Sequence, residues 1–457
     1  MPISSSKPRN TFKSLLAILG VILGGGCLVV FFLFFEGEEP QVSLEQTADY
    51  IGKNGIIHFS ASDGKSGLRS LTIWGSQGNI IKVLHTSTFP RSSSTGKIGE
   101  AETKGTVTFD TKKEGFTDGP LSIRIEATDY SLRGWQQGNK TILNKDVTVD
   151  TVPPQLQILQ SEKYISPGGA GIAIYRLSDN QCTSGVTING RHHPGFPVGD
   201  GRADTYIAYF ALPYDAQKID SLIVSAVDPA GNETVIPFTT VYKGVAQKTD
   251  TITLSDSFIG TKIPEFQQYY PEMKGDLIEQ YLYTNTTVRD LNNKEISELC
   301  RNSSPNRLWH GHFQRMAGSP RAGFADHRSY IYGGIIIDKQ VHLGVDIAST
   351  SRAEVRAANK GKVVFAHYLG IYGNMVMIDH GQGILSLYSH LSQMNVAPGD
   401  EVDKKSVVGL TGTTGMAGGD HLHFSMLVNG VFVMPKEWWD EHWIEVTIET
   451  PLSQSKF

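Results

Sequence analysis

Cysteine is scarce in this chain of 457 residues, which contains only Cys27, Cys182 and Cys300. Structural zinc sites are closed by four protein ligands and are usually rich in cysteine, so no such site is expected here. A disulfide between Cys182 and Cys300 could form in an oxidising compartment, but no spacing in the sequence supports it. Any metal chemistry must therefore use other side chains.

An excess of positive charge is also missing. The 41 lysines and arginines are outnumbered by 46 acidic residues, which gives a net charge of −5. Nucleic-acid binding favours a basic surface. We therefore expect no nucleic-acid partner.

One long apolar run stands near the N-terminus, from Ser14 to Phe35. It is long enough to cross a hydrocarbon core of ~30 Å. Basic residues precede it and acidic residues follow: Lys7, Arg9, Lys13, Glu36, Glu38 and Glu39. This asymmetry predicts a cytoplasmic N-terminus over residues 1–13, a transmembrane signal anchor over 14–35, and a periplasmic or wall-facing remainder. A cleaved signal peptide is the alternative, although the run is longer than a usual signal core.

Short alternating strands and turn signals fill residues 41–152 and 153–245. The run Leu121–Ala127, which follows Asp118-Gly119-Pro120, is an example. Many short strands broken by such turns predict β-sandwich domains, and both regions resemble bacterial immunoglobulin-like domains. We expect them to be spacers, with peptidoglycan or partner binding as the alternative.

Residues 246–328 change character. Helical spacing with plausible N-caps over 276–282 and 293–299 predicts a connecting segment of short helices. Such a segment could pack against the domain that follows, or cover its groove and hold it latent. The sequence leaves both open.

The chemistry-bearing residues come later, beginning with His421 and His423 in Gly-Asp-His-Leu-His-Phe-Ser. Side chains alternate along a strand, so both imidazoles should leave the same face. Imidazole is both a common metal ligand and a common general base. The pair could therefore supply one of each.

An HxxxD spacing joins His342 to Asp346 across Gly344. In an extended strand these residues would lie ~13 Å apart, too far to share a zinc ion. Gly344 and its β-branched neighbours disfavour a helix. The spacing therefore predicts a turn or bulge at Gly344 that brings the carboxylate back. Two imidazoles and one carboxylate would leave an open position on zinc, as catalytic sites do.

A third element, Leu385–Leu391, alternates like a strand. The pattern predicts that its leucines point one way while Tyr388 and His390 point the other. A second His-x-His, His310 and His312, has no carboxylate at metal spacing. Its neighbours are typical of a packing segment.

The order HxxxD, YxHL, HLHF resembles the lysostaphin/LytM-type family of zinc endopeptidases, which cut peptide bonds in peptidoglycan. The resemblance covers roughly 330–446 and includes four glycine-containing stretches: 357–364, 370–374, 398–402 and 409–415. It implies that His342, Asp346 and His423 are zinc ligands and that His390 and His421 are catalytic. His421 shares its strand face with a ligand, so we favour His421 as the base and His390 as the oxyanion stabiliser.

These observations together predict a mostly β chain. A LytM-type zinc peptidase domain over 329–447 follows two immunoglobulin-like β domains and a helical segment, behind a transmembrane helix. The predicted function is a membrane-anchored zinc endopeptidase that cuts peptidoglycan cross-links, with direct D-alanyl–diaminopimelate links as the expected substrate. A non-catalytic wall-binding or activator protein that retains the fold is the alternative.

Overall fold

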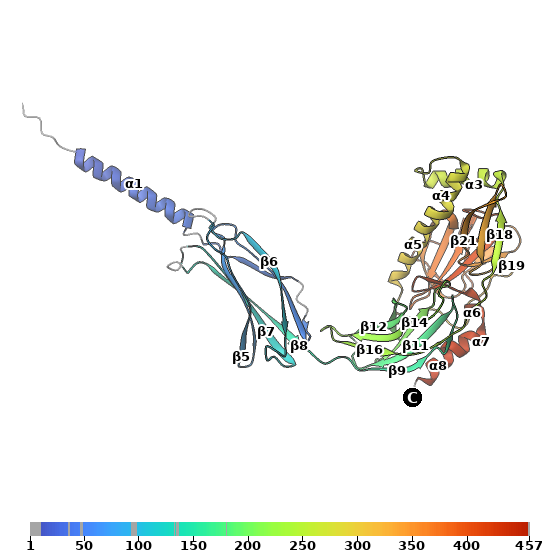
Figure 1. The fold of residues 1–457 in the computed structure, drawn as a ribbon, viewed down its shortest axis with the longest axis horizontal. Coiled ribbons are helices and arrows are strands. Elements are labelled where there is room, and N and C mark those ends of the chain that lie inside the picture. The colour runs from blue at the N-terminus through green and yellow to red at the C-terminus, as the bar shows by residue number, and fades with distance from the viewer. Residues whose placement is uncertain are drawn as a thin grey trace, which may run out of the picture. The chain divides into compact units, whose positions relative to one another are not determined.

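The computed structural model describes residues 11–34, 37–45, 49–92, 98–131, 133, 137–179 and 181–455. These residues form a mostly β structure, as predicted, and they divide into two compact units (Figure 1). One unit comprises Met1–Pro153 with Pro229–Asn232, and the other comprises Pro154–Asp228 with Glu233–Phe457.

The N-terminal apolar run forms helix α1 (Thr11–Phe34). Most of the predicted cytoplasmic N-terminus, residues 1–13, lies outside the described residues. Within the described part of the chain, no helix reaches the length and apolarity required to cross a membrane. The predicted transmembrane helix is therefore not supported by the structure.

The first unit contains two antiparallel sheets with a hydrophobic core. Its strands are β1 (Gln41–Glu45), β2 (Tyr50–Ile51), β3 (Asn54–Ser62), β4 (Leu68–Gln77), β5 (Ile80–Thr88), β6 (Glu102–Asp110), β7 (Gly119–Asp129) and β8 (Lys140–Val149). Strands β1-β3-β6 form one sheet; β2-β8-β7-β4-β5 form the other, in which the short β2 alone runs parallel to its neighbour. Along β7, Leu121, Ile123, Ile125 and Ala127 are buried, as the alternation predicts.

The second β region has a different topology. Its strands are β9 (Leu156–Ser161), β10 (Tyr164–Ile165), β11 (Ala170–Leu177), β12 (Thr183–Ile188), β13 (Arg191–Pro197), β14 (Thr205–Ala211), β15 (Leu222–Val227), β16 (Glu233–Pro237) and β17 (Val241–Tyr242). Seven of them form one sheet in the order β16-β15-β12-β13-β14-β11-β9. The two regions are thus not arranged alike, and their immunoglobulin-like character is not confirmed.

The C-terminal part of the second unit is built on an eight-stranded sheet. The strands from residue 249 onwards are β18 (Thr249–Thr253), β19 (Ser319–Ala322), β20 (His327–Tyr332), β21 (Ile335–Val341), β22 (Val345–Ala348), β23 (Glu354–Arg356), β24 (Gly361–Tyr368), β25 (Asn374–Asp379), β26 (Ile384–Ser389), β27 (Gln393–Met394), β28 (Glu401–Val402), β29 (Val407–Leu410), β30 (Leu422–Val428) and β31 (Val431–Val433). The main sheet runs β19-β22-β30-β26-β25-β24-β28, with β31 paired to β30. Two three-stranded sheets, β18-β20-β21 and β23-β29-β27, accompany it.

The connecting segment is helical in its middle, as predicted. The helices of the second unit are α3 (Asp256–Tyr269), α4 (Leu277–Tyr283), η1 (Thr284–Val288), α5 (Arg289–Leu299), η2 (Cys300–Asn302), η3 (Gly370–Tyr372), α6 (Pro435–Trp439), α7 (Glu441–Ile444), η4 (Glu445–Glu449) and α8 (Thr450–Gln454). Asp276 caps α4 in a reciprocal capping box with Glu279, which satisfies backbone N–H groups of the first turn. The segment also contributes β18, which pairs in parallel with β20 and which the sequence analysis missed.

Both faces of the main sheet are buried. Helices α3 and α5 cover one face, where Phe266 and Ile296 pack with Leu385, Leu387 and Leu427. Cys300 belongs to this cluster, whereas Cys182 lies in a separate one, so the two thiols form no disulfide.

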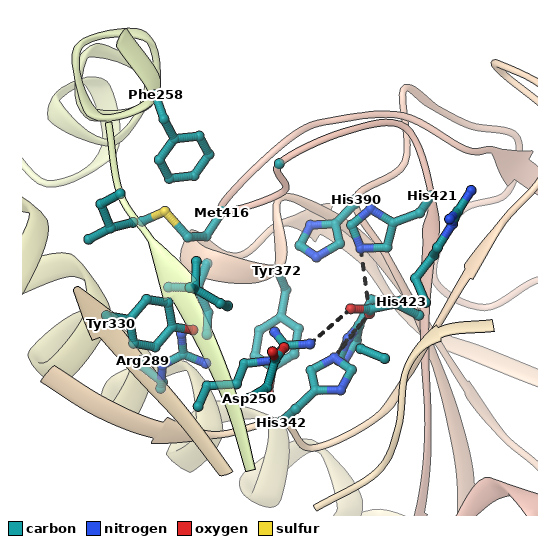
Figure 2. A pocket seen from close by; sticks show the side chains of 18 of the residues that line it. Asp250, Phe258, Arg289, Tyr330, His342, Tyr372, His390, Met416, His421 and His423 are labelled. Carbon is teal, nitrogen blue, oxygen red and sulfur yellow. Dashed lines mark hydrogen bonds and ion pairs between the residues drawn. The ribbon is translucent and has the colours of Figure 1, made fainter. Parts of the chain in front are cut away.

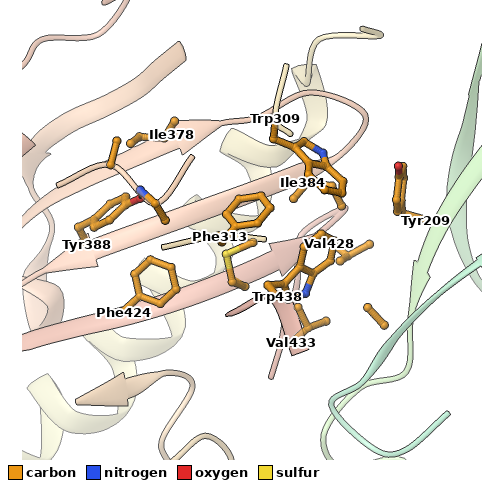
Figure 3. Close-up of a cluster of buried hydrophobic side chains, with 14 of the residues drawn as sticks. Tyr209, Trp309, Phe313, Ile378, Ile384, Tyr388, Phe424, Val428, Val433 and Trp438 are labelled. Carbon is orange, nitrogen blue, oxygen red and sulfur yellow. Dashed lines mark hydrogen bonds between the residues drawn. The ribbon is translucent and has the colours of Figure 1, made fainter. Parts of the chain in front are cut away.

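The opposite face packs against the second β region. Figure 3 shows Tyr209, from β14, beside Trp309 and Trp438 in a shared core. Trp309 and Phe313 are fully buried, so the His310–His312 stretch is a packing segment, as predicted. This β region therefore shares its core with the following domain and is more than a detached spacer.

Candidate metal centre and cavity

Three predicted ligands meet at one buried point. His342 Nε2 lies 3.0 Å from Asp346 Oδ1 and 2.9 Å from His423 Nδ1, and His423 Nδ1 lies 3.0 Å from Asp346 Oδ1. A tetrahedral zinc ion with bonds of ~2.0–2.1 Å spaces its ligands by roughly 3.3 Å, so the observed spacing is close to that required. The three side chains could therefore hold one metal ion.

The backbone explains how the sequence brings them together. Strands β22 and β30 pair antiparallel with Asp346 directly opposite His423. A bend at Gly344, between β21 and β22, returns the chain so that His342 faces Asp346. This is the turn that the HxxxD spacing predicted. A Cβ atom at position 344 would lie 2.6 Å from the His423 ring, so the close approach requires glycine.

The outer hydrogen bonds leave the right ring nitrogens free for a metal. His342 Nδ1–H donates to the Gly323 carbonyl at 2.7 Å. His423 Nε2–H donates to Ser425 Oγ at 3.1 Å, and Ser425 in turn donates to the Leu343 carbonyl. Each imidazole thus presents a lone pair to the cluster. Burial lowers the pKa of His423 to about 4, which favours this neutral form.

Three converging acceptors with no proton between them repel one another unless a cation lies among them. The donor set of two imidazoles and one carboxylate therefore fits a zinc ion, and it leaves one coordination position for water or substrate.

His421 lies at the edge of the same cluster. Its Nδ1–H donates to the Gly419 carbonyl at 2.7 Å, and its Nε2 lies 3.5 Å from Asp346 Oδ1. Burial opposes protonation of this ring, but the Asp346 carboxylate outweighs burial and raises the pKa of His421 above its ordinary value. Of the two histidines that are not ligands in the predicted set, His421 is the more basic.

His390 reaches the site by a route that the sequence did not predict. Strand β26 ends at Ser389, and His390 has a φ of +61°, in the left-handed region. Tyr388 points to the face where it contacts Phe424, whereas the His390 ring lies 4.9 Å from that of His421. The prediction that Tyr388 and His390 share a face is wrong, because the left-handed residue reverses the alternation.

The loop before His421 fixes the orientation of His390. The Thr414 carbonyl accepts a hydrogen bond from His390 Nδ1–H at 2.8 Å. Burial and the neighbouring imidazoles lower the pKa of His390 well below its ordinary value. Helix α3 holds this loop from outside, because Lys262 Nζ donates to the Thr413 carbonyl and Glu265 accepts from the Gly415 N–H. A neutral imidazole is thus held in a fixed pose.

A cavity of about 460 Å³ opens over the cluster (Figure 2). All five predicted site residues line it. Its far wall comes from the connecting segment, through β18 and the start of α3, with Phe258 labelled in Figure 2. Sequence analysis missed four other charged residues that line the cavity: Asp250, Arg289, Arg321 and Arg328. They carry no motif, so only the fold brings them together.

With this geometry in hand, the comparisons with known proteins place the domain. An antiparallel sheet carries a buried His₂Asp cluster beside two further histidines, and such a donor set suits a catalytic metal site. Residues 340–435 match peptidase family M23, which confirms the resemblance to the LytM and lysostaphin type. This stretch of the chain is therefore a peptidase family M23 domain.

Curated relatives match about a quarter of this chain. The DD-carboxypeptidase/endopeptidase Mpg of Neisseria meningitidis is 38% identical over 112 residues, which are 24% of each chain. The murein hydrolase activator EnvC of Escherichia coli is 33% identical over 95 residues, 21% of this chain and 23% of EnvC. The chain thus spans about a quarter of the length of these relatives.

Among solved structures, the catalytic domain of lysostaphin from Staphylococcus simulans is 29% identical. The match covers 27% of this chain and 92% of that domain, with a TM-score of 0.23.

Proposed function

We propose that this chain is a zinc endopeptidase that hydrolyses peptide cross-links of peptidoglycan. The observation that supports it most is the convergence of His342, Asp346 and His423 in a cavity that also contains His390 and His421. A protein that had lost catalysis would have no need for the complete set.

In this proposal, His342, Asp346 and His423 would hold a zinc ion, which would supply a Lewis acid and lower the pKa of water towards neutrality. His421 accepts the proton of the attacking water, since it has the raised pKa and stands at the open side of the cluster. Neutral His390 donates its one N–H, at Nδ1, to the Thr414 carbonyl, so its Nε2 carries a lone pair that can accept a hydrogen bond from the attacking water and orient it. The oxyanion-stabilising role predicted from the sequence would require the imidazolium form instead.

The amide C–N bond then breaks. The hydroxyl remains on the carbonyl carbon, and the proton carried by His421 passes to the leaving amine. When both products have dissociated, His421 is again without the extra proton, so the reaction consumes only water and the peptide.

The substrate proposed is the direct link between D-alanine and diaminopimelate. The endopeptidase activity in the name of the Neisseria relative is in keeping with it. Full-length protein in detergent would be incubated with peptidoglycan and the muropeptides analysed by mass spectrometry. Loss of cross-linked dimers with gain of intact monomers is expected, and cleavage of glycine-bridged substrate alone would contradict the assignment.

A second function, activation of another wall hydrolase without catalysis, is favoured by one observation: EnvC, which is named an activator, is 33% identical to this chain over 95 residues. The two proposals differ in what zinc does. If new amino termini appear with zinc and disappear with a chelator, the protein is an enzyme. If none appear while an added amidase is stimulated, it is an activator.

The location outside the cytoplasm is part of the proposal, because peptidoglycan lies there. Its further support is the uncharged run Ser14–Phe35, with basic residues before it and acidic residues after it. Amino-terminal sequencing of the mature protein, combined with carbonate extraction of membranes, would separate a retained anchor from a cleaved signal. A full-length protein recovered from the cytosol would refute this location.

A further inference from the structure

Two arginines beside the metal cluster have unused hydrogen-bond donors. Arg328, on β20, places a terminal nitrogen 3.2 Å from Asp346 Oδ2, while Asp346 Oδ1 faces the imidazoles. The Nε atom of Arg328 is buried and has no hydrogen-bond partner among the described residues. A buried N–H without a partner is costly, so it is expected to meet a polar group when the cavity is filled.

Arg321 lines the same cavity from strand β19, which pairs with β22. Strands β19 and β22 pair with Ala322 opposite Asp346, and the register shifts between Pro320 and Ala322. Arg321 is the extra residue of this irregularity, and such bulges re-aim a side chain. The exposed guanidinium lines the cavity and makes no hydrogen bond or ion pair within the described ranges of the chain.

The cavity is positively charged overall. Its charged lining consists of three arginines and two aspartates: Arg289, Arg321, Arg328, Asp250 and Asp346. Asp346 belongs to the metal cluster, and Arg289 already donates two hydrogen bonds to Asn285, so neither is free to bind a ligand. The side chains left for a ligand are Arg321 and Arg328 opposed by Asp250, and a divalent ion at the cluster would add to the positive charge.

We propose that Arg321 and Arg328 form a subsite for a carboxylate on the carbon atom that bears the leaving amine. This inference rests on the proposed function and specifies how the site selects its bond. Guanidinium groups bind carboxylates through paired, charge-assisted hydrogen bonds. Arg328 is close enough to the cluster that the carboxylate it binds must lie next to the scissile amide.

This placement distinguishes substrate classes. In the D-alanyl–diaminopimelate link, the leaving nitrogen is attached to a carbon that carries a free carboxylate. A terminal D-alanine shares this feature. In a glycine bridge the corresponding carbonyl is tied up in the next amide, so it offers no negative charge. The arginine pair would therefore favour the first two substrates and reject the third.

The test compares two cross-linked muropeptide dimers that differ in one group: a free carboxylate or a carboxamide on the leaving diaminopimelate centre. Full-length protein should cleave the carboxylate substrate with a kcat/KM higher by on the order of tenfold to a hundredfold, the range for hydrogen bonds to a charged group. In Arg321→Gln and Arg328→Gln this preference should fall towards unity. Arg328→Lys keeps the positive charge but cannot form paired hydrogen bonds, so its preference for the carboxylate dimer should lie between those of the wild type and Arg328→Gln.

The controls separate this inference from the proposed function. Arg356→Gln removes an exposed arginine that pairs with Glu354 outside the cavity, and it should keep the wild-type preference. Zinc content is measured for every variant, because Arg328 also contacts a ligand. If Arg328→Gln loses zinc, Arg321→Gln decides the question.

Equal cleavage of both dimers by the wild type, or an unchanged preference in Arg321→Gln, would overturn the subsite while leaving the endopeptidase proposal intact. Cleavage of neither dimer by the wild type would overturn the proposed function itself.

Discussion

The close approach of Gly344 to His423 gives the sharpest test of the metal centre. In Gly344→Ala the new Cβ would lie 2.6 Å from Cε1 and Nε2 of His423 and 2.7 Å from the Phe424 carbonyl oxygen. Non-bonded carbon atoms prefer separations of about 3.5–4.0 Å. The imidazole or the bend must therefore move by on the order of 1 Å. Overpacking of this kind costs about 1–3 kcal/mol of stability.

The metal should be affected more than the fold. Ligand distances in a metal site are fixed to within ~0.2 Å, and the required shift is several times larger. Loss of supporting groups alone weakens metal affinity by roughly 10- to 100-fold, so displacement of a ligand should exceed a hundredfold. The hydrogen bond from His423 to Ser425 would break at the same time.

The assay is zinc affinity by chelator competition, together with the melting temperature. Gly418→Ala is the matched control, since Gly418 lines the same cavity and a Cβ there meets nothing within 4 Å. Gly418→Ala should keep zinc and stability. Wild-type zinc affinity in Gly344→Ala would refute the reasoning, because it would mean that the ligand cluster does not depend on this bend.

Three further predictions follow from the contacts described. His423→Ala should lose zinc and turnover together, whereas His421→Ala should keep zinc and lose roughly 10²–10⁴-fold in kcat. If His421→Ala lost zinc and His423→Ala kept it, His421 would be the ligand and His423 the base. Lys262→Met and Glu265→Gln each remove a hydrogen bond from α3 to the loop that orients His390, so kcat should fall roughly ten- to a hundredfold at constant zinc content. An unchanged kcat would show that the loop keeps its conformation without these hydrogen bonds. Burial raises the pKa of Glu437 from 4.5 to about 8, so its contribution to stability is fully present below pH 4.5 and is lost as the pH rises through about 8. Because this side chain is only partly buried, the loss is about 2 kcal/mol, and Glu437→Gln should melt higher than wild type at pH 8.5 but not at pH 4.5.

The sequence was informative where local geometry left one solution. An extended strand separates His342 from Asp346 too widely, and a helix is disfavoured there, so only a bend at Gly344 remained. The N-cap at Asp276 likewise depends on neighbouring residues, and it was predicted correctly; the reciprocal bond from Glu279 is an addition from the structure. Both features are decided by a few neighbouring residues.

The failures have non-local causes. Nothing next to His390 announces its left-handed backbone, which the Thr414 carbonyl and the surrounding loop impose. Strand β18 is short and mostly exposed, so its sequence lacks an apolar period; it exists because β20 lies beside it. Arg328 resembles any other strand arginine until the fold places Asp346 against it.

Different segments of the second unit contribute the candidate metal cluster and the rest of the cavity lining. The stretch that matches peptidase family M23, 340–435, contains the three predicted ligands and both further histidines. Other parts of the cavity lining come from residues before that stretch: β18 belongs to the far wall, whereas Arg321 and Arg328 lie beside the cluster. In the proposed subsite, Arg321 and Arg328 contact the leaving group, so the choice of bond is expected to depend on the connecting segment, whereas the proposed hydrolysis depends on the histidines and Asp346 of residues 340–435.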